Sequence, residues 1–251
     1  MVDFLSIQNN YPKLTIPDST RKTDNLYISN NTLYKIFIDE YYFIEEKERN
    51  VNFLIANPIP NTPKIYDKLY IKKRFTGYIM EYIPNTITFR QAINMNIPIE
   101  RKIKAITDIY ETLKYLHSLN IYLGDIHSDN VLISNEGNGY IIDLEEIRFP
   151  GDEFKFKQYY IVDNGYGRIN IPSAYTDNVK LFISSLSLLI GKDLEAYVSD
   201  ISHDISLPKL YNEVIYPLQN EVLTEYCRNL IIKDSFEYFS DFINEKNLIR
   251  K

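Results

Sequence analysis

The chain contains very little cysteine, tryptophan or histidine. Among its 251 residues there are one cysteine, Cys227, three histidines and no tryptophan. A single cysteine cannot form an internal disulfide, and no group of Cys and His residues has the spacing of zinc ligands. These absences exclude a disulfide scaffold, argue against structural zinc, and favour a reducing, cytoplasmic setting.

Long apolar runs and an excess of basic residues are also missing. The most apolar stretch, Leu181 to Ile190, is short and contains three serines, so we expect neither a signal peptide nor a membrane span. With 34 acidic and 28 basic residues, the chain lacks the overall basic field that attracts nucleic acid. The hydrophobic share of 45% suits a globular protein, built as one large domain or two small lobes, of undetermined oligomeric state.

The first third of the chain has the pattern of an antiparallel sheet with one helix. Short runs rich in Tyr, Ile and Leu alternate with turn residues, as is typical of strands. The predicted strands are residues 25–29, 32–37, 64–72 and 77–81. Residues 39–56 are rich in Glu, Lys and Leu and are followed by Asn57-Pro-Ile-Pro60, which predicts a helix with a proline stop.

The rest of the chain is predicted to be mainly helical. Apolar residues recur at helical spacing from Ile99 to His117, which predicts a long amphipathic helix. Residues 177–190 predict a second, buried helix with Thr176 or Asp177 as its N-cap. Residues 192–251 alternate helical patterns with breaks at Pro208 and Pro217. The fold class is therefore predicted to be α+β.

One segment carries three polar residues whose chemistry suits phosphoryl transfer. Asp125 and Asn130 lie in Gly124-Asp-Ile-His-Ser-Asp-Asn130, between a predicted helix and the predicted strand 131–134. Asp143 follows a second predicted strand, residues 140–142. Phosphoryl transfer requires a carboxylate near the attacking hydroxyl and oxygen ligands for magnesium, and these three side chains supply both.

Residues 25–190 resemble a protein kinase-like domain. The loop 124–130 is most similar to the Gly-Asp-x-His-x-x-Asn version seen in aminoglycoside and choline kinase-like phosphotransferases and in atypical bacterial kinases. The resemblance implies a bilobal fold: a small antiparallel-sheet N-lobe with one helix at residues 1–81, a hinge at 82–86, and a mainly helical C-lobe at 87–251.

The resemblance also implies ATP and Mg²⁺ as cofactors and assigns roles within the loop. Asp125 would be the catalytic base, and Asn130 and Asp143 would be the metal ligands. His127 stands where most protein kinases have a lysine, two residues after the base. It would either contact the transferred phosphate, which the phosphotransferase-like branch favours, or brace the loop by hydrogen bonding.

Further roles follow for the predicted N-lobe and hinge. Lys35, in the strand Leu33-Tyr-Lys-Ile-Phe37, would bind the nucleotide phosphates and pair with a glutamate of the helix 39–56. Glu45, Glu46 and Glu48 compete for that place, and counting back from the helix end favours Glu48. Glu81 and Ile83 would present backbone groups to adenine at the hinge.

The chain also departs from the family pattern. No glycine precedes Gly77, so the segment Pro17 to Asp24 replaces a glycine-rich phosphate loop. The usual Asp-Phe-Gly becomes Asp143-Leu-Glu145. Asp177 is similar to the buried Asp that holds the backbone of the catalytic loop, which would be a structural role. His117 and His203 are expected to be ordinary helix or loop residues.

Two kinds of acceptor fit the resemblance. The loop 124–130 favours a small-molecule kinase acting on a sugar, amino alcohol or aminoglycoside. The segment Gly165 to Asp177 resembles the stretch by which protein kinases dock peptides, and only about 60 residues follow the central helix. The favoured hypothesis is a minimal Ser/Thr protein kinase. A catalytically dead binding module is the third reading, which the retained Lys35, Asp125, Asn130 and Asp143 oppose.

Overall fold

The computed structural model describes residues 7, 10–14, 25–37, 44–150, 152, 162–163, 165, 168–169, 171–198 and 205–232. The chain is a mixed α+β structure, which confirms the predicted class. Its contacts divide it into two compact units. Unit 1 is Met1–Asn85 together with Ile142–Glu146, and unit 2 is Thr86–Ile141 together with Ile147–Lys251.

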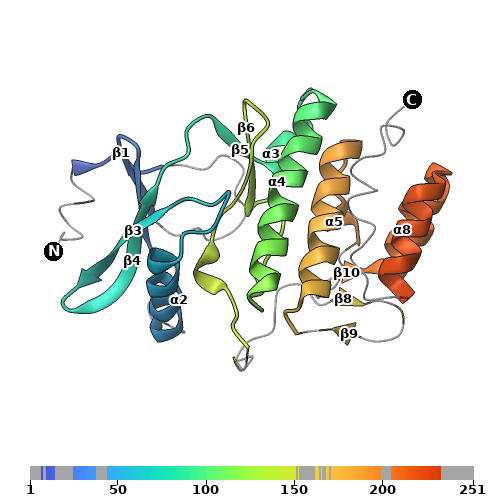
Figure 1. The fold of residues 1–251 in the computed structure, drawn as a ribbon. Helices are drawn as coiled ribbons and strands as arrows, with labels where there is room; N and C mark the ends of the chain where they lie inside the picture. Colours follow the sequence, from blue (N-terminus) through green and yellow to red (C-terminus); the bar gives the residue numbers. More distant parts are fainter. Residues whose placement is uncertain are drawn as a thin grey trace. The chain divides into compact units, whose positions relative to one another are not determined.

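Unit 1 contains a four-stranded antiparallel sheet in the order β1-β2-β4-β3 (Figure 1). Its strands are β1 (Asn25–Ser29), β2 (Thr32–Ile36), β3 (Ile65–Ile71) and β4 (Arg74–Glu81). All four lie where strands were predicted, although β4 begins earlier than residue 77. Lys72 and Lys73, with φ values of 48° and 68°, form a two-residue turn between β3 and β4.

One helix and one short turn complete unit 1. The predicted helix is confirmed as α2 (Ile44–Ala56), which packs against β3 and β4 through buried residues such as Val51 and Leu54 (Figure 1). The 3₁₀ turn η1 (Leu144–Glu146) also packs against α2. The chain thus returns from unit 2 to place five residues, Ile142–Glu146, in unit 1.

The first part of unit 2 combines a small sheet with a long helix. The antiparallel sheet has the order β5-β6-β7 and comprises β5 (Thr86–Thr88), β6 (Val131–Ser134) and β7 (Gly139–Ile141). The short helix α3 (Phe89–Ala92) follows β5, and α4 (Ile99–Ser118) packs against β6 and β7 (Figure 1). A Cβ at Gly139 would lie 2.1 Å from the Ala105 carbonyl oxygen, so glycine allows this close approach. The predicted hairpin and long helix are confirmed.

The central helix of unit 2, α5 (Ala174–Ile190), begins earlier than predicted. Its N-cap is Ser173, whose hydroxyl accepts the Thr176 N–H, while the Thr176 side chain accepts the Ser173 N–H. Thr176 and Asp177 therefore lie in the first turn, and the prediction of either as N-cap is wrong, because this capping box satisfies the helix start three residues upstream. Gly191, with φ 71°, ends the helix, and α5 packs beside α4 (Figure 1).

The remaining elements of unit 2 are short. A small sheet pairs β8 (Val162–Asp163) with β9 (Arg168–Ile169) and with β10 (Ile205–Ser206). The helical elements are α6 (Leu194–Val198), α7 (Leu207–Leu210), a π-helical turn (Tyr211–Ile215), a 3₁₀ turn (Tyr216–Leu218) and α8 (Glu221–Ile232). Pro208 lies in the first turn of α7, where its missing N–H is tolerated, so it starts a helix instead of breaking one. In the described part of the chain, no helix is long and apolar enough to cross a membrane.

Candidate functional site

Lys35 is a buried cation of unit 1, and two carboxylates contact it. Its Nζ lies 2.5 Å from Glu145 Oε1 and 2.9 Å from Asp143 Oδ1. Tyr78 donates its hydroxyl to Glu145 Oε2 at 2.8 Å. Lys35 is 3% exposed and Glu145 is 2% exposed, so the pair is shielded from solvent. We call Lys35, Tyr78, Asp143 and Glu145 the lysine cluster.

The register of the sheet and the turn after β7 build this cluster. Lys35 of β2 lies opposite Tyr78 of β4, which puts both side chains on one face of the sheet. The turn η1 brings Glu145 to the same place, and the Asn50 side chain of α2 donates to the Glu145 carbonyl at 2.9 Å. Helix α2 thus holds the backbone of the carboxylate that contacts Lys35.

The lysine cluster keeps Glu145 ionised. Burial alone would raise the pKa of Glu145, but the charges of Lys35 and Lys47, with hydrogen bonds from Lys35 and Tyr78, lower it to about 2. Burial, with the Glu145 charge second, raises the pKa of the Tyr78 hydroxyl. Tyr78 therefore remains a hydrogen-bond donor, and Glu145 a carboxylate, over the whole physiological range.

Asp143 occupies a less buried and more strained position than Glu145. Its side chain is 39% exposed, and its backbone has a φ of 63°, in the left-handed region that non-glycine residues rarely adopt. Strain of this kind costs on the order of 1–3 kcal/mol and is common at functional sites. The predicted metal ligand thus has an exposed carboxylate at a conformationally special residue.

The predicted partner of Lys35 is wrong. Glu48 accepts hydrogen bonds from Lys68 Nζ at 2.9 Å and from the Tyr70 hydroxyl at 2.5 Å, both on β3, and it does not pair with Lys35. Helical geometry turns Glu48 toward β3, whereas Asn50, two residues later, faces Glu145. Glu145 takes the place expected for a helix glutamate.

The predicted hinge residues lie at the end of unit 1. Glu81 is the last residue of β4, and its N–H already donates to the Lys64 carbonyl at 2.8 Å. The Glu81 N–H is therefore not the group that would meet adenine. Ile83 is half-buried, two residues beyond the strand.

In unit 2 the loop brings together Asp125, His127 and Asn130. The Asn130 side-chain NH₂ donates to the Asp125 carbonyl at 3.0 Å and approaches its carboxylate at 3.4 Å. The Asn130 N–H donates to the His127 carbonyl at 2.9 Å, which closes a turn. The Asp125 side chain is 32% exposed, so a reactant can reach it. The three predicted loop residues form one cluster.

His127 faces the predicted base. Its Nδ1 accepts the Asp129 N–H at 3.2 Å, which assigns the ring proton of the neutral imidazole to Nε2. Nε2 lies 3.6 Å from Asp125 Oδ2. The imidazole is 4% exposed. These contacts favour the bracing role over contact with a transferred phosphate.

Two buried charged side chains of α5, Asp177 and Lys180, hold the start of the loop. Asp177 accepts the N–H groups of Leu123 and Gly124, each at 2.8 Å, as its resemblance to a loop-holding Asp implied. His117, a residue of helix α4 as expected, has its Nε2 3.0 Å from the same carboxylate. Lys180, also on α5, donates to the Gly124 carbonyl, and burial lowers its pKa.

Sequence reasoning missed several of these residues, although the sequence carried signals for two. Lys180 is the one lysine in a helix whose residues are almost all buried, and Glu145 is a charged residue that replaces the expected glycine. Charged residues are rarely buried without partners, so each implied a partner elsewhere in the chain. Some expected features lie outside the described residues: the segment Pro17 to Asp24, which was expected to replace the phosphate loop, and His203.

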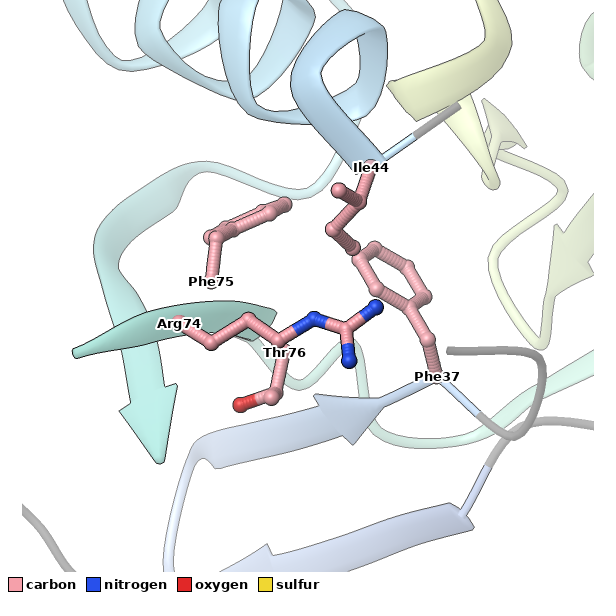
Figure 2. Close-up of a pocket in the computed structure, with 5 residues that line it drawn as sticks. All are labelled: Phe37, Ile44, Arg74, Phe75 and Thr76. Carbon is pink, nitrogen blue, oxygen red and sulfur yellow. The ribbon is translucent and has the colours of Figure 1, made fainter. Parts of the chain in front are cut away.

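A small hollow in unit 1 is separate from the predicted site residues. Figure 2 shows the five residues that line it, Phe37, Ile44, Arg74, Phe75 and Thr76. The rings of Phe37 and Phe75 meet edge to face, with their centroids 5.7 Å apart. Most of the lining is apolar, and no residue of the lysine cluster belongs to it. The hollow therefore is a packing feature at the start of α2.

The donor atoms suit magnesium better than zinc. Because the Asn130 NH₂ is committed to the Asp125 carbonyl, its amide oxygen is the atom left to bind a cation, and Asp143 supplies a carboxylate. Asn130 belongs to unit 2 and Asp143 to unit 1. Among the described residues, no group of three or more His, Cys, Asp or Glu side chains has the arrangement of a metal site.

Comparison with models of known protein families gives no match, and comparison with curated proteins gives none either.

Proposed function

We propose that the protein is an ATP- and Mg²⁺-dependent phosphotransferase with a bilobal protein kinase-like fold, which transfers the γ-phosphate of ATP to a protein Ser or Thr hydroxyl. The observation that carries this proposal is the loop of unit 2. It holds an accessible carboxylate, Asp125, against an asparagine whose amide oxygen is left for a cation. We further propose a cytoplasmic setting, from the single cysteine.

Asp125 acts as the base because its surroundings fix the carboxylate while leaving it accessible. Asp177 holds the backbone just before it, and the Asn130 side chain holds its carbonyl. In phosphoryl transfer such a carboxylate accepts or orients the proton of the attacking hydroxyl. His127 Nε2–H faces the same carboxylate and helps to orient it.

Lys35 binds the phosphates of the nucleotide. A lysine at the nucleotide site must keep its charge and a defined position, and Glu145 supports both, since it stays ionised and lies 2.5 Å from Nζ. Asp143 contacts the same ammonium group at 2.9 Å. Lys35 therefore stands beside the carboxylate that this proposal assigns to the metal.

Asn130 in unit 2 and Asp143 in unit 1 would each offer Mg²⁺ an oxygen ligand, and the ion supplies charge neutralisation of the phosphate oxygens when it is bound. Both residues carry the hard oxygen donors that this ion prefers. Asp143 is 39% exposed, so its carboxylate remains accessible from solvent.

Two segments of the chain favour different classes of phosphate acceptor. The segment Gly165 to Asp177, whose resemblance to a peptide-docking stretch favours a protein acceptor, is described at residues 165, 168–169 and 171–177. The loop motif favours a small hydroxylated molecule instead. The two acceptor classes are separated by the experiment below.

The test is phosphate transfer from γ-labelled ATP with magnesium. The purified protein is incubated with generic protein substrates and, separately, with a panel of sugars, amino alcohols and aminoglycosides. We expect labelled protein from the wild type and none from Asp125→Asn or Asp143→Ala. Glu136→Gln, the same kind of charge change in an exposed turn, should retain full activity.

Labelled metabolites without labelled protein would move the acceptor to the small-molecule class. Absence of any transfer, together with absence of magnesium-dependent ATP binding, would defeat the phosphotransferase and leave a binding module.

A further inference from the structure

The second half of the 124–130 loop is held by a closed ring of contacts around Ser128. The Ser128 N–H and hydroxyl both donate to Glu195 Oε1, each at 2.8 Å. The Ser128 carbonyl accepts the Arg90 N–H at 3.0 Å. Arg90 Nη2 donates to Glu195 Oε2 at 2.8 Å, which closes the ring. The backbone N–H and the carbonyl of Ser128 are therefore both held by residues outside the loop.

Local structure explains why Arg90 and Glu195 are available for these contacts. Thr88 caps α3, so Arg90 lies in the first turn, where a backbone N–H has no acceptor within the helix. That N–H donates to Ser128. The left-handed Gly191 ends α5, and Glu195 then lies in the first turn of α6.

The ring is buried at Ser128 and Glu195, and Arg90, whose side chain is 30% exposed, compensates the charge of Glu195. Ser128 is fully buried and Glu195 is 5% exposed. Glu195 Oε1 also accepts the Ser184 hydroxyl of α5 at 2.5 Å, so this carboxylate accepts four hydrogen bonds. A buried carboxylate with this many donors stays where its partners hold it.

Arg90 extends the hold to the residue beside Asn130. Its Nε lies 2.8 Å and 2.9 Å from the two oxygens of Asp129, and its Nη1 contacts Asp193. Arg90 thus fixes the backbone of Ser128 and the side chain of Asp129. These are the two residues that connect His127 to Asn130.

We infer that Glu195 and Arg90 are positioning residues for phosphoryl transfer, which hold Ser128 and Asp129 so that the Asn130 amide stays against Asp125. This inference rests on the proposed function for its kinetic part. Neither residue contacts the reacting atoms, and both act through the loop. Asp177 fixes the beginning of the loop, and Glu195 with Arg90 fixes its end.

The first test compares Glu195→Gln with Ser184→Ala in the full-length protein. Ser184→Ala removes one hydrogen bond to Glu195 but leaves its links to Ser128 and Arg90, so it controls for disturbance of the buried surroundings. Amide hydrogen exchange is measured on peptides that cover residues 123–130, α4 and α5. We expect exchange about tenfold faster in residues 123–130 of Glu195→Gln alone, with α4 and α5 unchanged.

The second test is kinetic. We expect Glu195→Gln to lower kcat by about 10- to 100-fold, because small displacements of catalytic groups cost about this much, and to change the KM for ATP by less than about threefold. Arg90→Lys keeps the positive charge and the backbone N–H but loses the planar guanidinium group that contacts several carboxylates at once. It should lower kcat in the same way by a smaller factor, and it serves if Glu195→Gln does not fold.

The outcomes separate this inference from the proposed function. Unchanged exchange in residues 123–130, or a kcat loss no larger than that of Ser184→Ala, would overturn the positioning role. If the wild type transfers no phosphate, the proposed function fails, and the exchange measurement still decides whether Glu195 and Arg90 hold the loop.

Discussion

In unit 1 a buried lysine meets carboxylates directly, whereas in unit 2 buried charged groups meet the backbone of a loop. Lys35 Nζ lies 2.5 Å from Glu145 Oε1, and both side chains are almost fully buried. In unit 2 the buried carboxylates of Asp177 and Glu195 accept backbone N–H groups instead. The candidate base in this loop, Asp125, has a side chain that remains 32% exposed.

The difference shows two ways of fixing a functional group. A long flexible side chain such as lysine has many rotamers, so a buried partner is required to hold its charged end. A short side chain such as aspartate is positioned by its own backbone, so it is enough to hold that backbone. In unit 1 the carboxylates therefore contact the lysine ammonium group itself, whereas in unit 2 they contact the backbone of the loop that carries Asp125.

The largest effect is expected from the accessible carboxylate itself. Asp125→Asn should lower kcat by about 10³-fold, since loss of a general base costs 10²- to 10⁴-fold. Stability should stay close to wild type, because this side chain is partly exposed. Initial rates with saturating ATP measure the effect, and Glu136→Gln is the control. A rate within about tenfold of wild type would remove Asp125 from the mechanism.

The second-largest effect is expected from Asp177, which holds the loop backbone in unit 2. Asp177→Asn places an amide where the N–H groups of Leu123 and Gly124 require an acceptor, and it removes a buried charge. We expect the free energy of unfolding to fall by about 3 kcal/mol, measured by urea denaturation. Asp108→Asn, which affects a partly exposed acceptor of the Gly139 N–H, should cost less than about 1 kcal/mol. Equal losses of unfolding free energy in Asp177→Asn and Asp108→Asn would contradict the view that a buried carboxylate supports the loop backbone in unit 2.

The ion pair of Lys35 and Glu145 in unit 1 should make the free energy of unfolding depend on pH in the acid range. The folded-state pKa of Glu145 is lowered from 4.5 to about 2, so its carboxylate stabilises the fold above pH 4.5. That contribution is lost as the pH falls toward 2. Glu145→Gln should therefore be less stable than wild type by about 3 kcal/mol at pH 7, and the difference should shrink between pH 4.5 and 2. Urea denaturation at several pH values measures it; a difference that stays constant across this window speaks against the pair.

The smallest effect is expected for Glu48, the helix glutamate that was predicted to pair with Lys35. Glu48→Gln breaks a partly exposed contact with Lys68 and Tyr70, so it should change the free energy of unfolding by less than about 1 kcal/mol. ATP affinity should be unchanged in this variant, whereas Glu145→Gln should raise the Kd for ATP by about tenfold. Titration of both variants with ATP gives the comparison. Equal losses would mean that Glu48 also acts on Lys35.

Much of the local structure could be predicted because it depends on short-range patterns. Short runs rich in Tyr, Ile and Leu between turn residues predicted β1 and β2, and helical spacing predicted α4 nearly to the residue. The start of α5 was missed because two residues in its first turn are also common N-caps, and only the reciprocal bonds of Ser173 and Thr176 decide between them. Pro208 was misjudged for a related reason, since proline both ends helices and begins them.

Within the candidate site, the loop residues and their partner Asp177 could be found, whereas the partners Glu145 and Glu195 could not. Asp125 and Asn130 lie close in sequence, so their contact follows from the spacing of one loop. Lys35 and Glu145 are 110 residues apart, and helix spacing pointed to Glu48 instead. The same separation hid Glu195, which lies 67 residues from Ser128.

The sequence by itself determined the α+β class, most strands and helices, and the choice of Asp125, Asn130 and Asp143 as candidate site residues. These depend on periodicity, turn residues and side-chain type, which are local properties. Only the tertiary structure decided which charges pair, that Ile142–Glu146 belongs to unit 1, and that Ser128 is held by Glu195 and Arg90. The physical reason is that a buried charge is stabilised by whichever partner packing brings within hydrogen-bond distance, and packing joins segments that no sequence spacing relates.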